Sequence, residues 1–387
     1  MAEAVIVAVA RTPIGRSHKG SLVDVDAFQL ARTVVTAAIA RSGVPEADID
    51  DLVLAESLQG GGVIGRYVAV QAGLSHVPGL ADNRHCAAGL SAVQIAAGTI
   101  MAGMDRVVVA GGTESLSSMP QSLKSVPGSA RDYHKWMSPT HPETPQAPAW
   151  DMAFTVGENT ARLAGVTREA SDDWALHSHL RAAASVAEGR FAEEIIPVEL
   201  PDGRTFDTDE HPRADTTAER LAGLRVLHPE LAGATVTAGN SAGLNDAAAA
   251  LVVTSAEYAR AHGLSPLARI VSWGSVGVEP ERTGLAPTLA VPRALERAGL
   301  KTADIDLFEI NEAFASVAVA SSRALGIEHD IVNVNGSGCG LGHPIAATGA
   351  RMVITMIGEL RRRGATLGCV SMCAGGGMGS ALVLEVL

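Results

Sequence analysis

The feature of this sequence that most constrains its fold is an internal repeat that relates its beginning to its end. Residues 38–50 have the pattern of an amphipathic helix that stops at a glycine and continues into an acidic turn, with a short apolar strand after it. Residues 294–306 have the same pattern in the same order. The residues of the first copy that recur at equivalent positions of the second are Gly43, Ala47, Asp48, Ile49 and Asp50.

Nearly the same offset relates Cys86 to His343. Each of these residues opens a predicted helix, and each helix leads to a buried strand that runs into glycines. Because the order is shared over a long segment, we predict two similar α/β halves stacked about a pseudo-twofold axis. Equivalent points of the two halves then meet, so Cys86 and His343 are expected to lie close together. The predicted helices cover 86–101 and 344–363, and the strands cover 106–110 and 366–372.

A segment of different composition separates the two halves. Residues 119–150 are rich in Pro, Ser and His and are expected to be irregular, whereas residues 154–190 have the pattern of helices with exposed Arg and Glu. We predict an N-terminal half of residues 1–118 plus about 246–266, a loop domain of residues 119–245, and a C-terminal half of residues 267–387.

The composition limits the class of protein and its partners. Hydrophobic residues make up 47% of the 387 residues and charged residues 19%, which favours an α/β protein with extensive buried sheet. The net charge of −12 argues against nucleic acid or an anionic membrane as a partner. No apolar run reaches the ~18 residues of a membrane span, and residues 4–10 read as a buried strand rather than a signal peptide. Four cysteines without a CxxC pattern predict free thiols in a reducing cytoplasm.

Cys86 is the first candidate for chemistry. It lies in the segment Asn83–Leu90 at the start of a predicted helix, where unpaired backbone N–H groups and the helix dipole are expected to lower the thiol pKa. The small residues that follow it leave room for a substrate. The alternative from this segment alone is a structural cysteine packed against the sheet.

His343 follows a glycine-rich loop, residues 336–342, in which the backbone is expected to come close to another group. The loop does not fit a dinucleotide-binding fingerprint, because a leucine stands at its sixth position and no acidic ribose partner is evident. The sequence leaves two interpretations of His343 open. It is either a residue that caps the helix or the base that a nucleophilic Cys86 requires.

Two further positions are candidates. Cys373 comes after a predicted strand and begins a glycine-rich turn, which suits either an oxyanion site or a plain tight hairpin. Asn311 follows another predicted strand and is placed either to hold a water or carbonyl or to cap a turn. A zinc site is a rival interpretation, but a strand from Cys369 to Cys373 puts their backbones about 13 Å apart. Its ligands would be Cys339, His343, Cys369 and Cys373.

Taken together, these segments resemble the thiolase family, and the resemblance covers essentially the whole chain. It implies a duplicated five-layer αβαβα fold with an inserted loop domain. The motifs stand in the family's order and are specific as a set. They are Arg11–Gly15, the Cys86 segment, Gly112–Ser115, Val236–Asn240, Asn311–Phe314, Gly342–Pro344 and Cys373–Gly377.

The resemblance implies reversible Claisen condensation and thiolysis of a 3-ketoacyl-CoA. Cys86, activated by His343, takes the acyl group as a covalent thioester. Cys373 is the acid/base for the α-proton of acetyl-CoA or for the incoming CoA thiol. His343 and a water held by Asn311 stabilise the enolate, and the N–H groups of Cys86 and Gly375 hold the acyl oxygen. CoA is then substrate and product, with no permanently bound cofactor and no metal.

Some positions depart from the family's pattern, and they line the expected acyl and pantetheine channel. Ala88 stands where many members have serine, Ser241-Ala242-Gly243 replaces Ala-Ser-Gly, and Met152-Ala153 replaces Met-Gly. These changes leave the acyl chain length open. The resemblance assigns Arg225 to contact with the CoA phosphate or adenine. The other expected substrate contacts are Met152, Ser241, Gly243 and Phe314.

Two alternative functions use the same residues. A condensing enzyme that acts on carrier-protein thioesters pairs its cysteine with two histidines, or with His and Glu, and Cys373 disfavours it. A catalytically silent acyl-CoA or lipid-binding relative is expected to lack Cys86 or His343, and both are present. The resemblance also implies a homodimer built on the first half or a homotetramer, with residues 120–148 as a contact.

Overall fold

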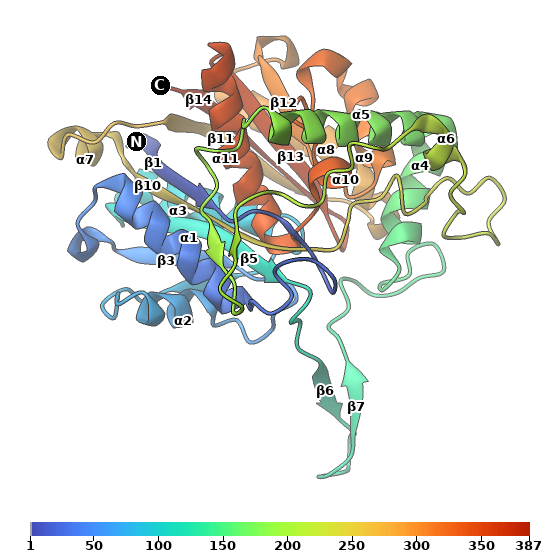
Figure 1. Cartoon of the computed structure of the whole chain (residues 1–387), viewed down its shortest axis with the longest axis horizontal. Coiled ribbons are helices and arrows are strands. Elements are labelled where there is room, and N and C mark those ends of the chain that lie inside the picture. Colours follow the sequence, from blue (N-terminus) through green and yellow to red (C-terminus); the bar gives the residue numbers. More distant parts are fainter. Residues whose placement is uncertain (1) are drawn as a thin grey trace.

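One continuous mixed sheet, built from two similar halves, organises the molecule (Figure 1). The computed structural model describes residues 2–387. The strand order is β12-β13-β14-β11-β1-β10-β5-β3-β4, with β2 paired to β10. Within the sheet of the described residues, the pairing of β1 with the start of β11, at Val5–Arg269 and Ile6–Ala268, joins the two halves. The strands are β1 Ala4–Arg11, β2 Gly15–Arg16, β3 Asp51–Ala55, β4 Leu80–Asp82, β5 Val107–Ser115, β10 Asn245–Ser255, β11 Ala268–Gly277, β12 Leu307–Ile310, β13 Leu367–Ala374 and β14 Met378–Val386.

Three apolar cores separate five layers of structure. One core lies between the first half of the sheet and its outer helices, a second is built around the two central helices, and a third covers the outer face of the second half. The predicted five-layer fold is confirmed. The outer helices of the first half are α1 Ala27–Ser42, α2 Ile64–Gln71 and α7 Ala256–Ala261; the central pair is α3 Ala88–Met101 and α11 Ile345–Arg363; and α8 Pro287–Ala298 and α9 Ala315–Leu325 cover the second half.

The central helices cross at glycines, which lets their backbones touch. A Cβ atom on Gly89 of α3 would lie 2.3 Å from the carbonyl oxygen of Ala346 in α11, and one on Gly349 would lie 2.2 Å from the backbone nitrogen of Leu90. Only a residue without a side chain fits such an approach. The first turns of α3 and α11 are therefore pressed together, and the segments that precede them meet.

The predicted helix stops are confirmed, but the two central helices begin later than expected. Gly43 and Gly299 end α1 and α8 in the left-handed conformation, both at φ 69°. Helix α3 begins at Ala88 rather than Cys86, because His85 has a φ of 46° and Cys86 lies in a turn. Helix α11 begins at Ile345, because Pro344 has an extended ψ of 91°.

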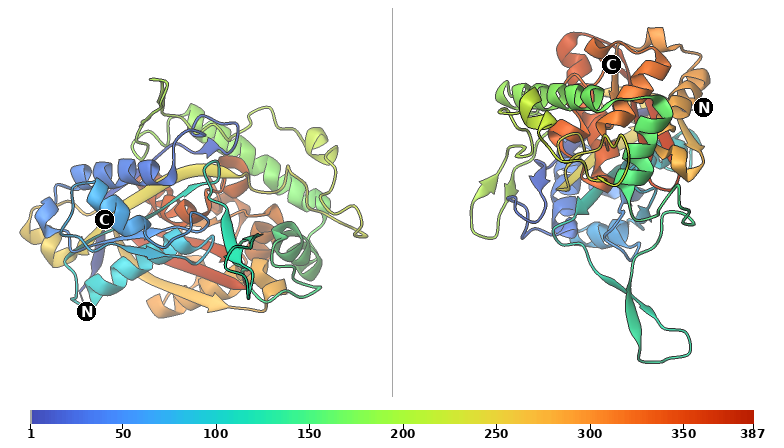
Figure 2. Two further views of the ribbon diagram at one scale, coloured as in Figure 1. Left: turned by 90° about the horizontal axis from the view of Figure 1, so that it is seen from below. Right: turned by 90° about the vertical axis from the view of Figure 1, so that its right-hand side faces the viewer.

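The segment between the halves contains more regular structure than its composition predicts. Residues 119–150 include a two-stranded hairpin that projects away from the body (Figures 1 and 2), and all of its strand residues are exposed. A π-helix, Ala153–Glu158, leads into the helices expected after residue 154. The elements of this segment are β6 Ser122–Ser125, β7 Tyr133–Trp136, α4 Asn159–Ala164, α5 Arg168–Ala187, β8 Val198–Glu199, β9 Thr205–Phe206 and α6 Ala218–Ala222. The remaining short helices are α10 Gly338–Leu341 and 3-10 turns at Glu46–Asp48, Pro280–Leu285, Thr302–Asp304 and His329–Ile331.

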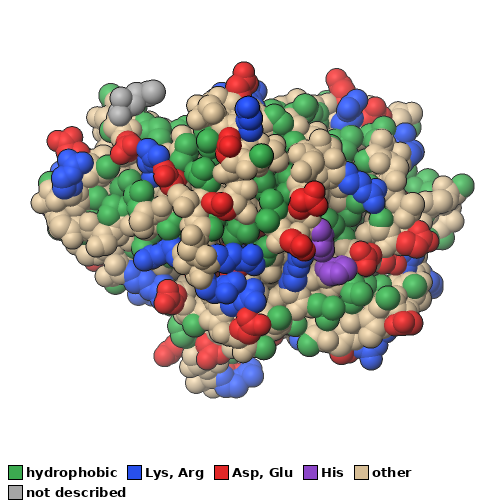
Figure 3. All heavy atoms as spheres, turned by 90° about the horizontal axis from the view of Figure 1, so that it is seen from above, with side chains coloured by type: hydrophobic (Ala, Val, Ile, Leu, Met, Phe, Trp, Pro, Cys, Tyr) green, Lys and Arg blue, Asp and Glu red, His purple; other side chains and the backbone are tan. Residues whose placement is uncertain are grey.

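The excess of acidic residues does not produce a uniformly negative surface. On the face shown in Figure 3, acidic side chains are scattered, and Lys and Arg side chains gather near the centre. Within residues 2–387, no helix combines the length and the hydropathy of a membrane-spanning segment.

Candidate active site

Cys86 lies in the turn that precedes α3, at the inner end of the first half. The backbone N–H groups of Gly375 and of Cys86 itself lie close to the sulfur and act to lower its pKa. Burial nevertheless raises the pKa of the Cys86 thiol to about 11, and the nearby Glu114 carboxyl acts in the same direction. The expectation that the helix start lowers this pKa is therefore wrong, because loss of water outweighs two backbone donors. At neutral pH the resting residue is the thiol.

His343 lies in the turn before α11, the equivalent position of the second half. Its Nδ1 is 2.7 Å from the Thr348 hydroxyl, and its backbone N–H donates to Asn245 Oδ1 at 3.0 Å. Burial, and then the charge of Arg351, lower the pKa of His343 to about 3, so the ring is neutral near pH 7. Its Nε2 is buried and has no hydrogen-bond partner within residues 2–387.

Glu114 connects the two turns. Its carboxylate accepts from the backbone N–H of Ala346 at 3.2 Å and from Gln59 Nε2 at 2.8 Å. This carboxylate also contributes to the raised pKa of Cys86. With the contact between α3 and α11, the Glu114 bridge places the Cys86 turn and the His343 turn side by side, although they lie far apart in the chain.

The second thiol lies beside the first. Cys373 is within β13, where it pairs with Gly379 of β14, and not after the strand as predicted. Burial and the neighbouring Cys86 raise the pKa of Cys373 well above its usual range. The turn that follows brings the Gly375 N–H to the Cys86 sulfur, so both thiols and one oxyanion donor share a small volume.

Asn311 follows β12 and is fully buried. Its backbone N–H donates to Ser371, but its side-chain oxygen and nitrogen have no partner in the described part of the chain. An unpaired buried polar group costs about 1–3 kcal/mol, and such groups in folded proteins call for an explanation. The Asn311 amide and the Nε2 of His343 are two such groups, on segments that adjoin the strand of Cys373 and the turn of Cys86, which suits a site that binds a polar ligand.

The residues expected on the substrate side are only partly brought together. Met152 and Phe314 pack in the same small apolar cluster as Cys373. Ser241 pairs through its backbone with Phe314, and its hydroxyl donates to the carbonyl of Thr237 at 2.6 Å. Gly243 packs on His211, which a Cβ atom would approach to 2.1 Å. Arg225 lies on the surface loop after α6, with an exposed side chain.

Two polar neighbours of His343 were not anticipated from the sequence. Asn245, at the start of β10, holds its backbone, and Thr348, one helical turn into α11, holds its ring. The sequence carried a signal for the contact with Thr348 in the spacing between the two residues. A residue just before a helix lies beside the residues that end the first turn of that helix. The contact with Asn245 had no local signal, since that residue comes from a distant strand.

The structure also bears on the zinc alternative. Cys339 and Cys369 belong to the core of the second half, whereas Cys373 lies in the cluster with Met152 and Phe314. Among residues 2–387, no group of three or more His, Cys, Asp or Glu side chains is arranged to hold a metal ion.

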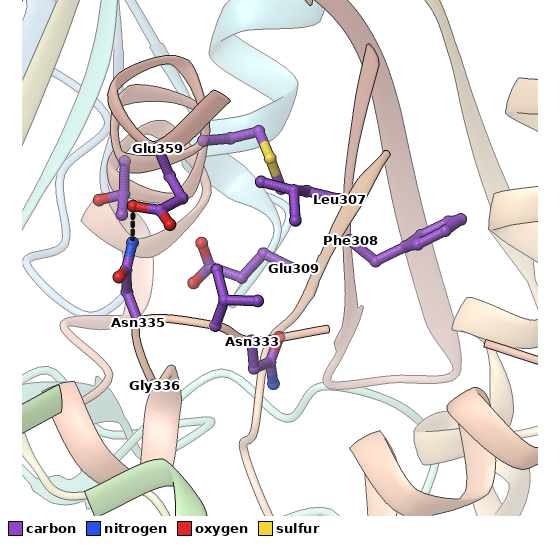
Figure 4. A pocket seen from close by; sticks show the side chains of 10 residues that line it. Leu307, Phe308, Glu309, Asn333, Asn335, Gly336 and Glu359 are labelled. Atoms are coloured by element: carbon purple, nitrogen blue, oxygen red, sulfur yellow. Dashed lines mark hydrogen bonds between the residues drawn. The ribbon is translucent and has the colours of Figure 1, made fainter. Parts of the chain in front are cut away.

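Two cavities flank this region, and they differ greatly in size. The first, of about 10 Å³, lies behind the His343 loop (Figure 4) and has room for about one water. Glu309, which pairs with the buried Arg351, is in its wall, and Asn335 donates to Glu359 at 3.2 Å. The second, of about 1230 Å³, lies between the hairpin base and the first half, and His85 and Met378 are in its wall. Only the second has room for a substrate group.

Comparison with known proteins gives consistent matches over the whole chain. The family model of the thiolase N-terminal domain matches residues 4–257, and that of the C-terminal domain matches residues 264–386. The acetyl-CoA acetyltransferase of Cupriavidus necator is 41% identical, and the 3-ketoacyl-CoA thiolase of Bacillus subtilis is also 41% identical; both alignments cover 100% of this chain and 100% of the relative.

Solved structures give the same result. The crystal structure of Bacillus anthracis acetyl-CoA acetyltransferase is 40% identical and superposes with a TM-score of 0.92 over 100% of this chain and 99% of its own. The human mitochondrial 3-ketoacyl-CoA thiolase in complex with CoA is 34% identical, also with a TM-score of 0.92, over 100% of this chain and 98% of its own.

Proposed function

This chain is a member of the thiolase family, and on that premise we propose that it transfers acyl groups between CoA thioesters through Cys86. It is an acyltransferase of the thiolase type. The observation that carries the proposed site is the cluster of two thiols and the Gly375 N–H in one buried region, with unpaired polar atoms of His343 and Asn311 on the segments that adjoin it.

The first half-reaction forms the acyl-enzyme. The Cys86 sulfur attacks the thioester carbonyl while its proton passes to His343 Nε2. The N–H groups of Cys86 and Gly375 stabilise the oxyanion, and the CoA sulfur leaves with the proton that His343 returns. Because the pKa of Cys86 is raised and that of His343 is lowered, proton transfer accompanies the attack and does not precede it.

The second half-reaction uses the other thiol. Cys373, as the thiolate, removes the α-proton of acetyl-CoA in condensation, or takes the proton of the incoming CoA thiol in thiolysis, and becomes the neutral thiol. The enolate carbon, or the CoA sulfur, then bonds to the acyl carbon as the bond to the Cys86 sulfur breaks, and the proton held by Cys373 returns to the Cys86 sulfur. His343, and a water held by the Asn311 amide, stabilise the enolate oxygen. The apolar contacts of Cys373 with Met152 and Phe314 support this role, since they shield the reacting carbon from water.

The acyl group is expected to extend beyond acetoacetyl. The cavity of about 1230 Å³ reaches His85, the neighbour of Cys86, and offers far more room than a four-carbon group fills. We expect CoA-dependent loss of enolate absorbance with 3-ketoacyl-CoAs of increasing length, with kcat/KM at least as high for six or more carbons as for four. Activity confined to acetoacetyl-CoA would contradict this expectation. Activity only with carrier-protein thioesters, or binding without turnover, would support the alternative functions.

The exposed apolar surface supports a homo-oligomer, a dimer built on the first half or a tetramer. Strand β4 is an open sheet edge, which favours pairing with another copy. The exposed side chains on this edge, on α2 and on the hairpin are Leu80, Val63, Tyr67, Val70, Leu123, Tyr133 and Trp136. Light scattering is expected to give two or four times the 39.7 kDa of one chain, and deletion of the hairpin is expected to leave a dimer. A monomer at micromolar concentration would contradict both expectations.

We also propose a cytoplasmic location, with acyl-CoA and CoA as the small-molecule partners and no permanently bound cofactor. All four cysteines are free thiols, which suits a reducing compartment. The human relative crystallised with CoA supports the assignment of CoA as substrate and product.

A further inference from the structure

The hydrogen bonds of the Thr348 hydroxyl distinguish between the two neutral forms of His343. The hydroxyl oxygen lies 3.0 Å from the carbonyl oxygen of Pro344, which can only accept, and 2.7 Å from His343 Nδ1. A hydroxyl has one proton. If Thr348 donates that proton to Pro344, it accepts from Nδ1–H, and both contacts are hydrogen bonds. If it donates to Nδ1 instead, two oxygens face each other at 3.0 Å without a proton between them.

The other ring nitrogen favours the same assignment. With the proton on Nδ1, the buried Nε2 is a free acceptor, and the His343 turn adjoins the Cys86 turn through the hydrogen bond from Ala346 to Glu114. With the proton on Nε2, a buried N–H would have no acceptor within residues 2–387. The structure therefore favours the Nδ1–H form, whose Nε2 is free to act as a base.

We propose that Thr348 is a positioning residue for the transfer reaction: its hydroxyl holds His343 in the form that accepts the Cys86 proton, and then holds the imidazolium that results. This inference rests on the proposed function of Cys86 and His343. In the step itself, the S–H bond breaks and its proton moves to Nε2, while the sulfur bonds to the acyl carbon and the π electrons of the carbonyl move onto its oxygen. The C=O bond then reforms, the bond to the CoA sulfur breaks, and that sulfur takes the proton from Nε2. The Thr348 hydroxyl keeps its own proton, which it donates to the Pro344 carbonyl throughout, and neither gains nor loses an atom.

The surroundings of His343 leave the Thr348 hydroxyl to determine which neutral form the ring adopts. Arg351, which is buried beside Glu309, contributes to lowering the pKa of His343 to about 3, so the ring is neutral. A neutral ring has two forms, and only one can accept a proton at Nε2. The ring position is fixed in parallel. Asn245 holds the backbone of His343, and Gly342 lies so close that a Cβ atom there would be 2.5 Å from Asn245 Oδ1.

Substitution of Thr348 tests this inference. Thr348→Val keeps the shape of the side chain and removes the acceptor, so we expect kcat to fall about 10- to 100-fold, the factor for losing a hydrogen bond to a charged group. KM for the acyl-CoA should change little, because Thr348 is buried behind the ring. Thr348→Ser keeps the hydroxyl and should retain most of the activity. The rate at which iodoacetamide alkylates Cys86, which needs the base but not CoA, should fall in Thr348→Val and not in Thr348→Ser.

A matched control is available in the same helix. Thr355→Val removes another buried hydroxyl of α11, one that donates to Glu194 at 3.2 Å, and it should leave kcat unchanged. Wild-type kcat in Thr348→Val, equal losses in the Val and Ser variants, or a change in KM alone would overturn the inference. If Thr348→Val does not fold, Thr348→Ala against Thr348→Ser makes the same comparison. An inactive wild-type enzyme would instead contradict the proposed function.

Discussion

Cys86→Ala is expected to abolish both covalent acylation and turnover. The substitution removes the only protein atom in the proposed mechanism that forms a bond to the acyl carbon, and His343 and the Gly375 N–H then have no thiol to activate or hold. A loss of about 10⁴-fold or more is expected, the scale that follows removal of a covalent nucleophile. Intact-mass spectrometry after incubation with acyl-CoA should show an acyl adduct on the wild-type chain and none on the variant.

Cys369 provides the matched control for this experiment. It is also a buried thiol, but it packs in the core of the second half and takes no part in the proposed chemistry. Cys369→Ala is expected to lose some stability, because it leaves a small cavity, and to keep the adduct and the turnover. An acyl adduct that persists in Cys86→Ala would show that another residue is the nucleophile.

Cys373→Ser is expected to separate the two half-reactions. Attack by Cys86 needs His343 and the oxyanion donors, so the variant should still accept an acyl group from a thioester. It should then fail to condense or thiolyse, because a serine hydroxyl is a far weaker acid than a thiol. General acid–base groups contribute about 10²- to 10⁴-fold, and a loss in that range should leave the acyl-enzyme to accumulate.

Mass spectrometry of the Cys373→Ser variant with acetyl-CoA measures that accumulation directly. Cys86→Ala is the comparison: Cys373→Ser should trap the acyl-enzyme, whereas Cys86→Ala should never form it. A Cys373→Ser variant that turns over at the wild-type rate would show that Cys373 is not the acid/base. A variant that cannot be acylated would show that the roles of the two thiols are wrongly divided.

Much of the fold was predictable because its determinants are local. The helix stops at Gly43 and Gly299 follow from the freedom of glycine to adopt positive φ, and the strands follow from short apolar runs. The hairpin within residues 119–150 was missed. Its strands are short and fully exposed, so they carry no alternation of buried and exposed residues for a sequence pattern to reveal.

The sequence proposed the candidate site residues, but it did not predict their protonation. The repeat and the motifs singled out Cys86, His343 and Cys373, since each stands at an element end beside glycines. The pKa of Cys86 was predicted in the wrong direction. A helix start indicates nearby N–H donors, but nothing in the local sequence states how much water the surrounding segments exclude.

The sequence by itself determined the duplicated order of helices and strands and the glycines that let α3 and α11 touch, and it proposed Cys86, His343 and Cys373 as the nucleophile, base and second thiol. Only the tertiary structure decided the protonation state of Cys86, the form of the His343 ring held by Thr348, and the unpaired amide of Asn311. The physical reason is that propensity and backbone freedom depend on neighbours in the chain. Desolvation and hydrogen-bond partners at the site depend instead on segments such as Gly375, Asn245 and Arg351, which become neighbours only when the two halves pack together.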